Sequence, residues 1–443
     1  MLLTTASDET EPTFGAFTDH PLRQEVNDEV HARPYEVLKA PLRVTHLAML
    51  SGRHGAQGDR NAVVDLCERF GLEPPDEGAH HLSMDFGRFR LKWERRTELS
   101  TYTFFVDGEF EDPFAAPAIG AVPRNWLDTL PGPRLVGVHL ALEPAWFMPR
   151  NVEEIVRLFN HNTIIGSHIT GGAARVWTDF HIHGDGFSRI LLRDVRLRER
   201  QAGRAVQRLL EIETYRMMAL LAFPVARRAN PRLTEIEEQL AGITEDLAAS
   251  GASDERGLLD SLSELAAHVE RINNRTNYRF NAAMAYHALV ERRIRELREE
   301  RVQGLQTIEE FMDRRLAPAM RTCRTVMERQ GSLSRRISRT GDLLRTRVDV
   351  ALEAQNRDLL EAMNRRARLQ FRLQETVEGL SVAAISYYLM GLVGYLLVAG
   401  RDAGLPLRVE LAQGALVPVV VLTVWLLIRF VRTRIARRNR EAT

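Results

Sequence analysis

Lysine and cysteine are almost absent from this sequence of 443 residues. Lys39 and Lys92 are the only lysines, so arginine occupies nearly every basic position. Cys67 and Cys323 are the only cysteines and stand far apart, which excludes a disulfide framework or a zinc-ligand spacing built on thiols. We therefore expect two reduced, buried thiols in a reducing compartment.

An excess of charge of one sign is also lacking. The formal net charge is +1 although 27% of the residues are charged, which argues against a strongly basic nucleic-acid binder and predicts no nucleic-acid partner. Residues 1–11 are polar and acidic and contain no apolar run, so we expect no cleavable secretory signal and a body that stays in the cytoplasm. Phosphate-binding loops and nucleophile elbows are missing as well, and the sequence predicts no cofactor.

Two long runs without charge lie close to the C-terminus, at 379–399 and 411–428. They contain about 21 and about 18 residues, which matches the length of a helix that crosses a bilayer. Pro418 lies inside the second run, where a membrane helix tolerates proline. The short connection between the runs predicts an antiparallel hairpin of two transmembrane helices in the segment 379–430, with the lipid bilayer as a partner.

Arginines flank this predicted hairpin on one side. Arginines precede the first run and follow the second, namely Arg365, Arg366, Arg368, Arg372, Arg429, Arg432, Arg434, Arg437 and Arg438. Because positive charge stays inside, both termini are predicted to face the cytoplasm, with a basic cytoplasmic tail at 431–443. The pattern predicts a multi-pass protein of the bacterial cytoplasmic (inner) membrane, whose arginines could bind anionic lipid heads.

The N-terminal part has the pattern of a mixed domain. We expect disorder over 1–17 and an α+β cytoplasmic domain with a mostly antiparallel sheet over 18–195. Polar and apolar residues alternate in several short runs, as they do in half-buried strands. The expected strands are 43–50, 81–92, 99–106, 134–142, 163–170, 175–183 and 188–194, and the expected helices are 59–70 and 152–159.

From 196 to 378 the sequence predicts a helical bundle that continues as a long stalk. The expected helices are 198–229, 233–249, 254–301, 308–330 and one from about 335, with breaks at Asn230–Pro231, at Gly251–Ala252 and at Gly331–Ser332.

The last of these helices carries an apolar stripe that runs into the first uncharged run, so it needs coiled-coil or bundle packing, and we expect a homo-oligomer. Asn356, Gln370 and Gln374 interrupt or border the stripe. They either fix the register of the packed helices or line a polar pathway.

One histidine motif suggests metal chemistry. His181, His183 and Asp185 lie in the stretch HIHGDG, which begins like the zinc signature of metallo-β-lactamase-like hydrolases but lacks its final histidine. The alternative is a set of structural or surface histidines before a tight glycine turn. A second group, His20, Glu25, Glu29 and His31, lies close together in the sequence and could bind a metal, exchange protons or simply anchor the N-terminal segment.

Four segments carry a family resemblance. HPLRQEVNDEVHARP at 20–34 and the stretches 203–226, 339–366 and 373–396 resemble an uncharacterised family of bacterial membrane proteins, a domain of unknown function. The order of the predicted segments is also similar to that of CorA-type magnesium transporters, a likeness that implies a pentameric channel. The Gly-Met-Asn signature of that family is replaced here by Ala399-Gly400-Arg401, and an arginine at the mouth would repel divalent cations.

Three functional classes follow from these patterns. The first is a non-enzymatic oligomeric anchor that presents the cytoplasmic domain to partners. The second is a CorA-like ion channel or transporter that is gated through the stalk. The third is a membrane-tethered enzyme that uses the histidines of the body.

Overall fold

The structure is a computed structural model that describes residues 19–24, 26–27, 35–52, 55–249, 255–402 and 408–440, without the side chains of 401–402, 432–433 and 435–440. The chain forms two compact units. The first contains the residues up to Ala248 together with Asp260–Thr340, and the second contains Ala249–Leu259 and the residues from Gly341. The segment 1–17, for which disorder is predicted, and residues 403–407 of the predicted outer loop lie outside the described residues.

A nine-stranded mixed sheet forms the centre of the first unit, in the order β2-β3-β4-β1-β5-β8-β7-β6-β9. Its one parallel pair among the described strands is β5 with β8, and the other neighbours are antiparallel. The strands are β1 (Leu42–Met49), β2 (His81–Asp85), β3 (Arg90–Arg95), β4 (Ser100–Asp107), β5 (Arg134–Glu143), β6 (Ile165–Ile169), β7 (Ala174–Thr178), β8 (Ser188–Asp194) and β9 (Glu300–Arg301). The prediction of a sheet domain followed by long helices is confirmed.

Two strand predictions and the end of one predicted helix are corrected by the structure. The expected strand 81–92 is divided into β2 and β3 by a turn, in which Gly87 has φ +79° and its N–H donates to Asp85 Oδ1 at 2.8 Å. The expected strand 175–183 ends at Thr178, so the histidine motif lies in a loop. The expected helix 254–301 ends at Leu297, and Glu300 and Arg301 form β9, which is too short to show an alternating pattern.

One face of the sheet is covered by α2 (Ala56–Phe70), the 3-10 helix η1 (Ala118–Ala121), α3 (Arg124–Leu127) and α4 (Val152–Leu158). Apolar residues of α2 pack on aromatic side chains of β3 and β4 in one cluster, which includes Leu66, Trp93, Phe104 and Trp126. A second cluster under α4 includes Phe159 and Trp177. Alternate residues of each strand supply this face because successive side chains in a strand point to opposite sides.

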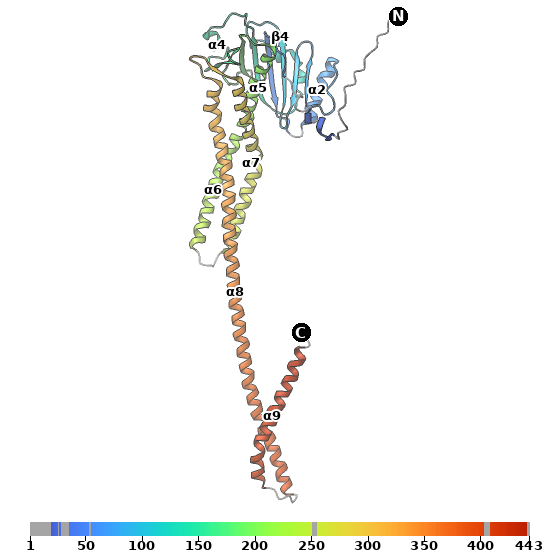
Figure 1. Cartoon of the computed structure of the whole chain (residues 1–443), viewed down its shortest axis with the longest axis vertical. Coiled ribbons are helices and arrows are strands. Elements are labelled where there is room, and N and C mark those ends of the chain that lie inside the picture. Colours follow the sequence, from blue (N-terminus) through green and yellow to red (C-terminus); the bar gives the residue numbers. More distant parts are fainter. Residues whose placement is uncertain are drawn as a thin grey trace, which may run out of the picture. The chain divides into compact units, whose positions relative to one another are not determined.

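Helix α5 (Glu199–Leu220) lies against the opposite face of the sheet (Figure 1). A glycine permits its close approach to the segment before β1. A Cβ atom at Gly203 would lie 1.7 Å from the backbone oxygen of Glu36. Any residue other than glycine would therefore clash there unless the backbone moved. The N–H of Leu38 also donates to the carbonyl of Glu199 at 3.2 Å, so this segment and the start of α5 form one packed layer.

The helices α6 (Ala222–Ala249), α7 (Glu255–Leu297) and the first part of α8 (Ile308–Asp402) pack together in the first unit. Arg329 of α8 forms an ion pair with Glu237 of α6, and Asn273 of α7 donates to Ser334 of α8. In the interior, the side-chain amide of Gln330 donates to Thr276 Oγ1 at 3.0 Å, and both residues are buried. This buried polar pair fixes the register of α7 against α8.

Of the three predicted breaks in this helical region, the one at Gly251–Ala252 lies outside the described residues, and the other two are wrong. The chain breaks at Leu221 instead, and Pro231 lies inside α6, where the buried residues Ala229 and Leu233 keep the helix packed on either side of it. Gly331 and Ser332 lie inside α8, because Gln330 and Leu333 are buried there and hold the helix in place. Burial of an apolar face outweighs the local preference of proline and glycine at these positions.

The second unit contains the rest of α8 and α9 (Val409–Arg440). Each holds a segment long and apolar enough to cross a membrane. The two segments contact each other: Ser386, Val420 and Val424 are buried, and a Cβ atom at Gly394 would lie 2.3 Å from Gln413 Nε2. Small residues at such contacts let two apolar helices approach closely.

Candidate functional site

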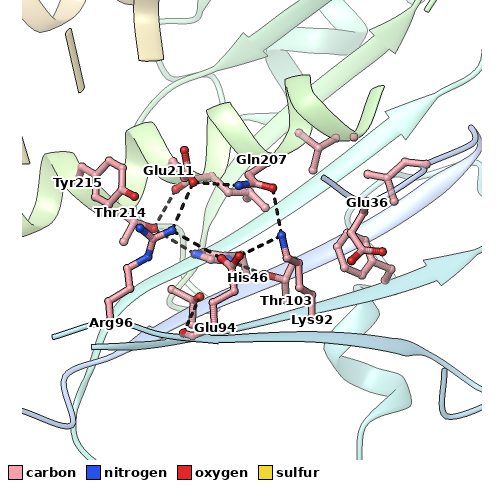
Figure 2. Close-up of a pocket in the computed structure, with 16 residues that line it drawn as sticks. Glu36, His46, Lys92, Glu94, Arg96, Thr103, Gln207, Glu211, Thr214 and Tyr215 are labelled. Atoms are coloured by element: carbon pink, nitrogen blue, oxygen red, sulfur yellow. Dashed lines mark hydrogen bonds and ion pairs between the residues drawn. The ribbon is translucent and has the colours of Figure 1, made fainter. Parts of the chain in front are cut away.

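A cluster of charged side chains fills the space between the sheet and α5 (Figure 2). Lys92 and Glu94 of β3 and Arg96, which follows that strand, point to this face because they alternate with Leu91 and Trp93, which point to the aromatic face. Helix α5 contributes residues spaced three or four apart, and these lie on one side of the helix. They are Gln207, Glu211, Thr214 and Tyr215.

Glu211 is the centre of this network. Its Oε1 accepts from Gln207 Nε2 at 3.1 Å and lies 3.4 Å from Arg96 Nη2, and its Oε2 accepts from Arg293 Nε at 2.5 Å. The three partners belong to α5, to the end of β3 and to α7. One carboxylate therefore joins two helices and the sheet.

Glu94 forms the second negative centre. Its Oε1 lies 3.1 Å from Lys92 Nζ, and its Oε2 lies 3.6 Å from Arg96 Nη2. Lys92 also donates to Gln207 Oε1 at 3.1 Å. Burial acts to lower the pKa of Arg96, but neighbouring Tyr215, Glu94 and Glu211 outweigh it and raise that pKa, so Arg96 stays charged.

The network continues along α7. Arg293 also forms an ion pair with Glu296 of α7. The Glu296 carboxylate forms a second ion pair with Arg208 of α5. Further along α7, Arg279 forms an ion pair with Glu98, and the hydroxyl of Tyr286 donates to the same carboxylate at 3.3 Å. Ion pairs thus fasten α7 to α5 and to the loop after β3.

His46 lies in this cluster as a neutral, fixed group. Its Nδ1 is 2.8 Å from Thr103 Oγ1 and its Nε2 is 3.1 Å from Thr214 Oγ1, and burial lowers its pKa to about 4. A histidine with both ring nitrogens engaged in this way is poorly placed to take a proton from a substrate. The geometry assigns it to holding α5 on β1 and β4.

The cavity that these residues enclose has a volume of about 30 Å³. That space holds about one water molecule, whereas pockets for small ligands measure roughly 300–1,000 Å³. The cluster is therefore a closed clamp between helix and sheet. It offers no room for a substrate in this conformation.

The residues of the predicted metal motif have separate roles. His183 is buried, with Nδ1 3.1 Å from Asn160 Nδ2 and Nε2 3.0 Å from Asp179 Oδ2. Asp185 accepts from the N–H of Phe187 at 2.9 Å and closes the glycine turn, while His181 is exposed. Within the described ranges, no group of three or more His, Cys, Asp or Glu residues could hold a metal ion. The structural alternative fits these contacts better than the metal site does.

Of the second histidine group, only His20 is described. It is exposed, and its Nδ1 accepts from the N–H of Leu22 at 3.2 Å. Glu25, Glu29 and His31 lie outside the described residues.

The polar residues predicted for register or for a pathway, Asn356, Gln370 and Gln374, are all exposed on α8. Arg365, Arg366, Arg368 and Arg372 are exposed on the same helix. On α9 the guanidinium of Arg429 lies 5.0 Å from the centre of the Trp425 ring, and that of Arg434 lies 5.1 Å from the Phe430 ring. The side chains of Arg432, Arg437 and Arg438 lie outside the description.

The sequence did contain a signal for the charged cluster that the prediction missed. Lys92, Glu94 and Arg96 recur at every second position through a strand that also contains Leu91 and Trp93. Such a strand has one charged and one apolar face. Besides the pairs among themselves, these side chains meet Gln207 and Glu211 of α5, more than a hundred residues away, and spacing alone does not reveal those partners.

Comparison with known proteins gives one match. The sequence profile of the family described as "Protein of unknown function (DUF3422)" matches residues 18–435. No curated protein and no solved structure matches the chain.

Proposed function

The chain belongs to the DUF3422 family of proteins of unknown function, and we propose that it is a non-enzymatic, oligomeric anchor in the bacterial cytoplasmic membrane. In this proposal the helical hairpin of α8 and α9 spans the bilayer twice, and the sheet domain is presented to partners in the cytoplasm. The closed charged clamp under α5 would keep that domain rigid.

The exposure of the two apolar segments carries the proposal. Only 11% of the 18-residue apolar stretch in each segment is buried, whereas the core helix of a soluble protein would be mostly buried. Large side chains such as Leu392 (61% exposed), Leu396 (71%) and Leu422 (58%) face outward. Contiguous apolar surface of this extent is unfavourable in water and favourable in lipid.

The flanking side chains support an orientation with both ends in the cytoplasm. The arginines at 365–372 precede the first apolar segment, and those from 429 onward follow the second. The positive-inside rule therefore places both of these ends in the cytoplasm. Trp425 beside Arg429 is a pair suited to the interface, since the ring stays in the apolar edge and the guanidinium reaches the head groups.

Exposed apolar residues between Gly341 and the first segment support assembly. Leu352, Leu359, Leu373 and Leu380 lie in one row with a period of seven residues, which Arg366 interrupts, and Asn356, Met363, Gln370 and Val377 form a second row with the same period. All eight side chains are exposed on the surface of the single chain. Two such rows, three and four residues apart, are the seam of a coiled coil. The proposed partner is a second copy of this helix.

Membrane insertion and orientation can be tested together by cysteine labelling. The native Cys67 and Cys323 are buried, so a new surface thiol reacts above a low background. In intact cells, a membrane-impermeant maleimide should label Gly404→Cys, and it should label the control Ser332→Cys only after the membrane is opened. Labelling of Ser332→Cys in intact cells, or extraction of the wild type by carbonate, would contradict the proposal.

Assembly can be tested by native mass spectrometry of the protein in detergent. The wild type should appear as an oligomer. Leu359→Glu, in the seam, should dissociate it, while Ala354→Glu, on the same helix outside both rows, should leave it assembled. A monomeric wild type would contradict the oligomer.

A CorA-like channel is the second candidate, and the polar residues in one row of the seam favour it. Asn356 and Gln370 occupy positions of one row that are otherwise Met363 and Val377. In an assembly these amides would face the axis and line a polar path. Ion flux in proteoliposomes that equals that of empty vesicles would remove this candidate.

A further inference from the structure

A second cavity lies in the first unit, away from the charged clamp. It has a volume of about 350 Å³ and is lined by the loop after β7, by α5 and by the first turns of α8. The residues that matter for the argument are Phe180, His181, Arg216, Phe311 and Arg315. Its size is within the range of pockets that hold small molecules.

An aromatic platform forms one wall of this cavity. The rings of Phe180 and Phe311 are stacked, with centres 4.9 Å apart and planes at 19°. The guanidinium of Arg216 lies 5.3 Å from the centre of the Phe180 ring. Leu220, Met312 and Leu316 add apolar surface. A flat apolar group would find both a stacking surface and a cation beside it.

Phe180 adopts a backbone conformation that a large residue rarely takes, with φ +52°. Asp179 holds it there. This carboxylate is buried, accepts from Asn162 Nδ2 at 2.8 Å and from the N–H of His181 at 3.1 Å, and lies 3.0 Å from His183 Nε2. A strained residue that the surroundings fix in this way is typical of functional sites.

The charge of the cavity is positive. Asp179, the carboxylate in the lining, is already engaged by these partners. Arg216 is held in a two-point ion pair by the buried Glu213, at 2.7 and 3.0 Å. Arg315 is exposed and has no ion-pair or hydrogen-bond partner in the described part of the chain, and the imidazole of His181 is exposed beside the platform. One guanidinium therefore remains to meet an anion.

We propose that this cavity binds a small organic carboxylate with a flat, apolar body. The body packs against the Phe180–Phe311 pair on the ring surface that the pair leaves open to the cavity, and the carboxylate pairs with Arg315 in the forked geometry that arginine favours. Because α8 supplies Phe311, Met312, Arg315 and Leu316, an occupied cavity contacts the helix that also contains the first apolar segment. The binding itself depends only on the first unit and does not require membrane insertion.

Sodium benzoate is a suitable probe, measured by isothermal titration calorimetry on the full chain in detergent. Wild type should bind it saturably with one site per chain. Benzamide, which keeps the ring without the charge, and acetate, which keeps the charge without the ring, should each bind at least about tenfold more weakly. Saturable binding of all three with equal strength, or no saturable binding of benzoate, would overturn the proposal.

Matched variants locate the site. Arg315→Gln should weaken benzoate about tenfold or more, whereas Arg314→Gln, at a neighbouring exposed position outside the lining, should bind as wild type does. Phe311→Leu keeps an apolar side chain but removes the stack, and it should also weaken benzoate. If Arg315→Gln and Phe311→Leu both bind benzoate as wild type does, the ligand is elsewhere and the assignment is wrong.

Discussion

The two faces of the sheet are built from the same strands and stabilised in different ways. On the face under α2, Trp93, Phe104 and Trp126 are fully buried against one another. On the face under α5, Glu94 and Glu211 form ion pairs with Lys92, Arg96 and Arg293. These pairs connect β3, α5 and α7. Apolar burial is nearly free of direction, whereas ion pairs and hydrogen bonds demand a geometry. The aromatic face supplies stability, and the charged face fixes where α5 and α7 lie.

Each face also contains one buried histidine, and the two are compared easily because their strands are neighbours. His46 of β1 lies on the charged face between two threonine hydroxyls. His139 of β5 lies on the other face, 3.0 Å from Thr45 Oγ1 and stacked on Phe187 with ring centres 4.0 Å apart. Burial lowers the pKa of both to about 4. Each is neutral at physiological pH.

The largest effect is expected on the aromatic face. Trp126→Ala removes a fully buried ring that meets Tyr102 and Phe104 edge-on and donates from Nε1 to the carbonyl of Ala62 at 2.7 Å. We expect a loss of about 4 kcal/mol in the free energy of unfolding of the sheet domain, from urea titrations followed by circular dichroism. Trp146→Ala, where the ring is 64% exposed, should cost less than about 0.5 kcal/mol. Equal losses in the two variants would refute the assignment of stability to this face.

The charged face should respond somewhat less to removal of its centre. Glu211→Gln keeps the shape but leaves Arg96 and Arg293 without their shared carboxylate. Breaking a buried ion pair in this way costs roughly 3–5 kcal/mol, and we expect about 3 kcal/mol because both arginines retain contact with water.

Glu238→Gln, on an exposed part of α6, is the control and should be neutral. Hydrogen exchange should show the loss for Glu211→Gln first in α5 and α7, since these are the helices that the carboxylate joins. Loss of protection confined to β2 and β3 would contradict the role of a clamp.

The same difference explains what the sequence could reveal. Strands such as 134–142 and 188–194 were predicted almost to the residue, because a short apolar run, alternating or continuous, between polar and turn residues is a local signal. The breaks at Asn230–Pro231 and Gly331–Ser332 were wrong, because the side chains that hold those helices straight, such as Leu233 and Leu333, act through distant partners.

The candidate site follows the same rule. His181, His183 and Asp185 drew notice as a motif, yet His183 is structural, while His181 lines a cavity whose residues outside this loop come from α5 and α8. Glu211 and Arg293 have no motif around them and became visible only once the fold brought β3, α5 and α7 together. The register amide predicted at Asn356 is exposed on the single helix and stays a prediction, and the sequence contained no sign of Gln330, a buried amide paired with Thr276 in the bundle.

The smallest expected effect is the dependence of stability on pH that arises from the two buried histidines. The folded-state pKa values of His46 and His139 are about 4, below the unfolded value of 6.5, so the unfolded chain binds more protons between pH 6.5 and 4. Stability is therefore lost as the pH falls through this window, by about 2 kcal/mol for each histidine between pH 7 and pH 5. His46→Gln and His139→Gln, each compared with wild type in urea titrations at both pH values, should each remove about that much of the loss. If both variants lose as much stability as wild type does between pH 7 and pH 5, the two imidazoles are not held neutral by burial, and the two faces do not share a buried neutral histidine.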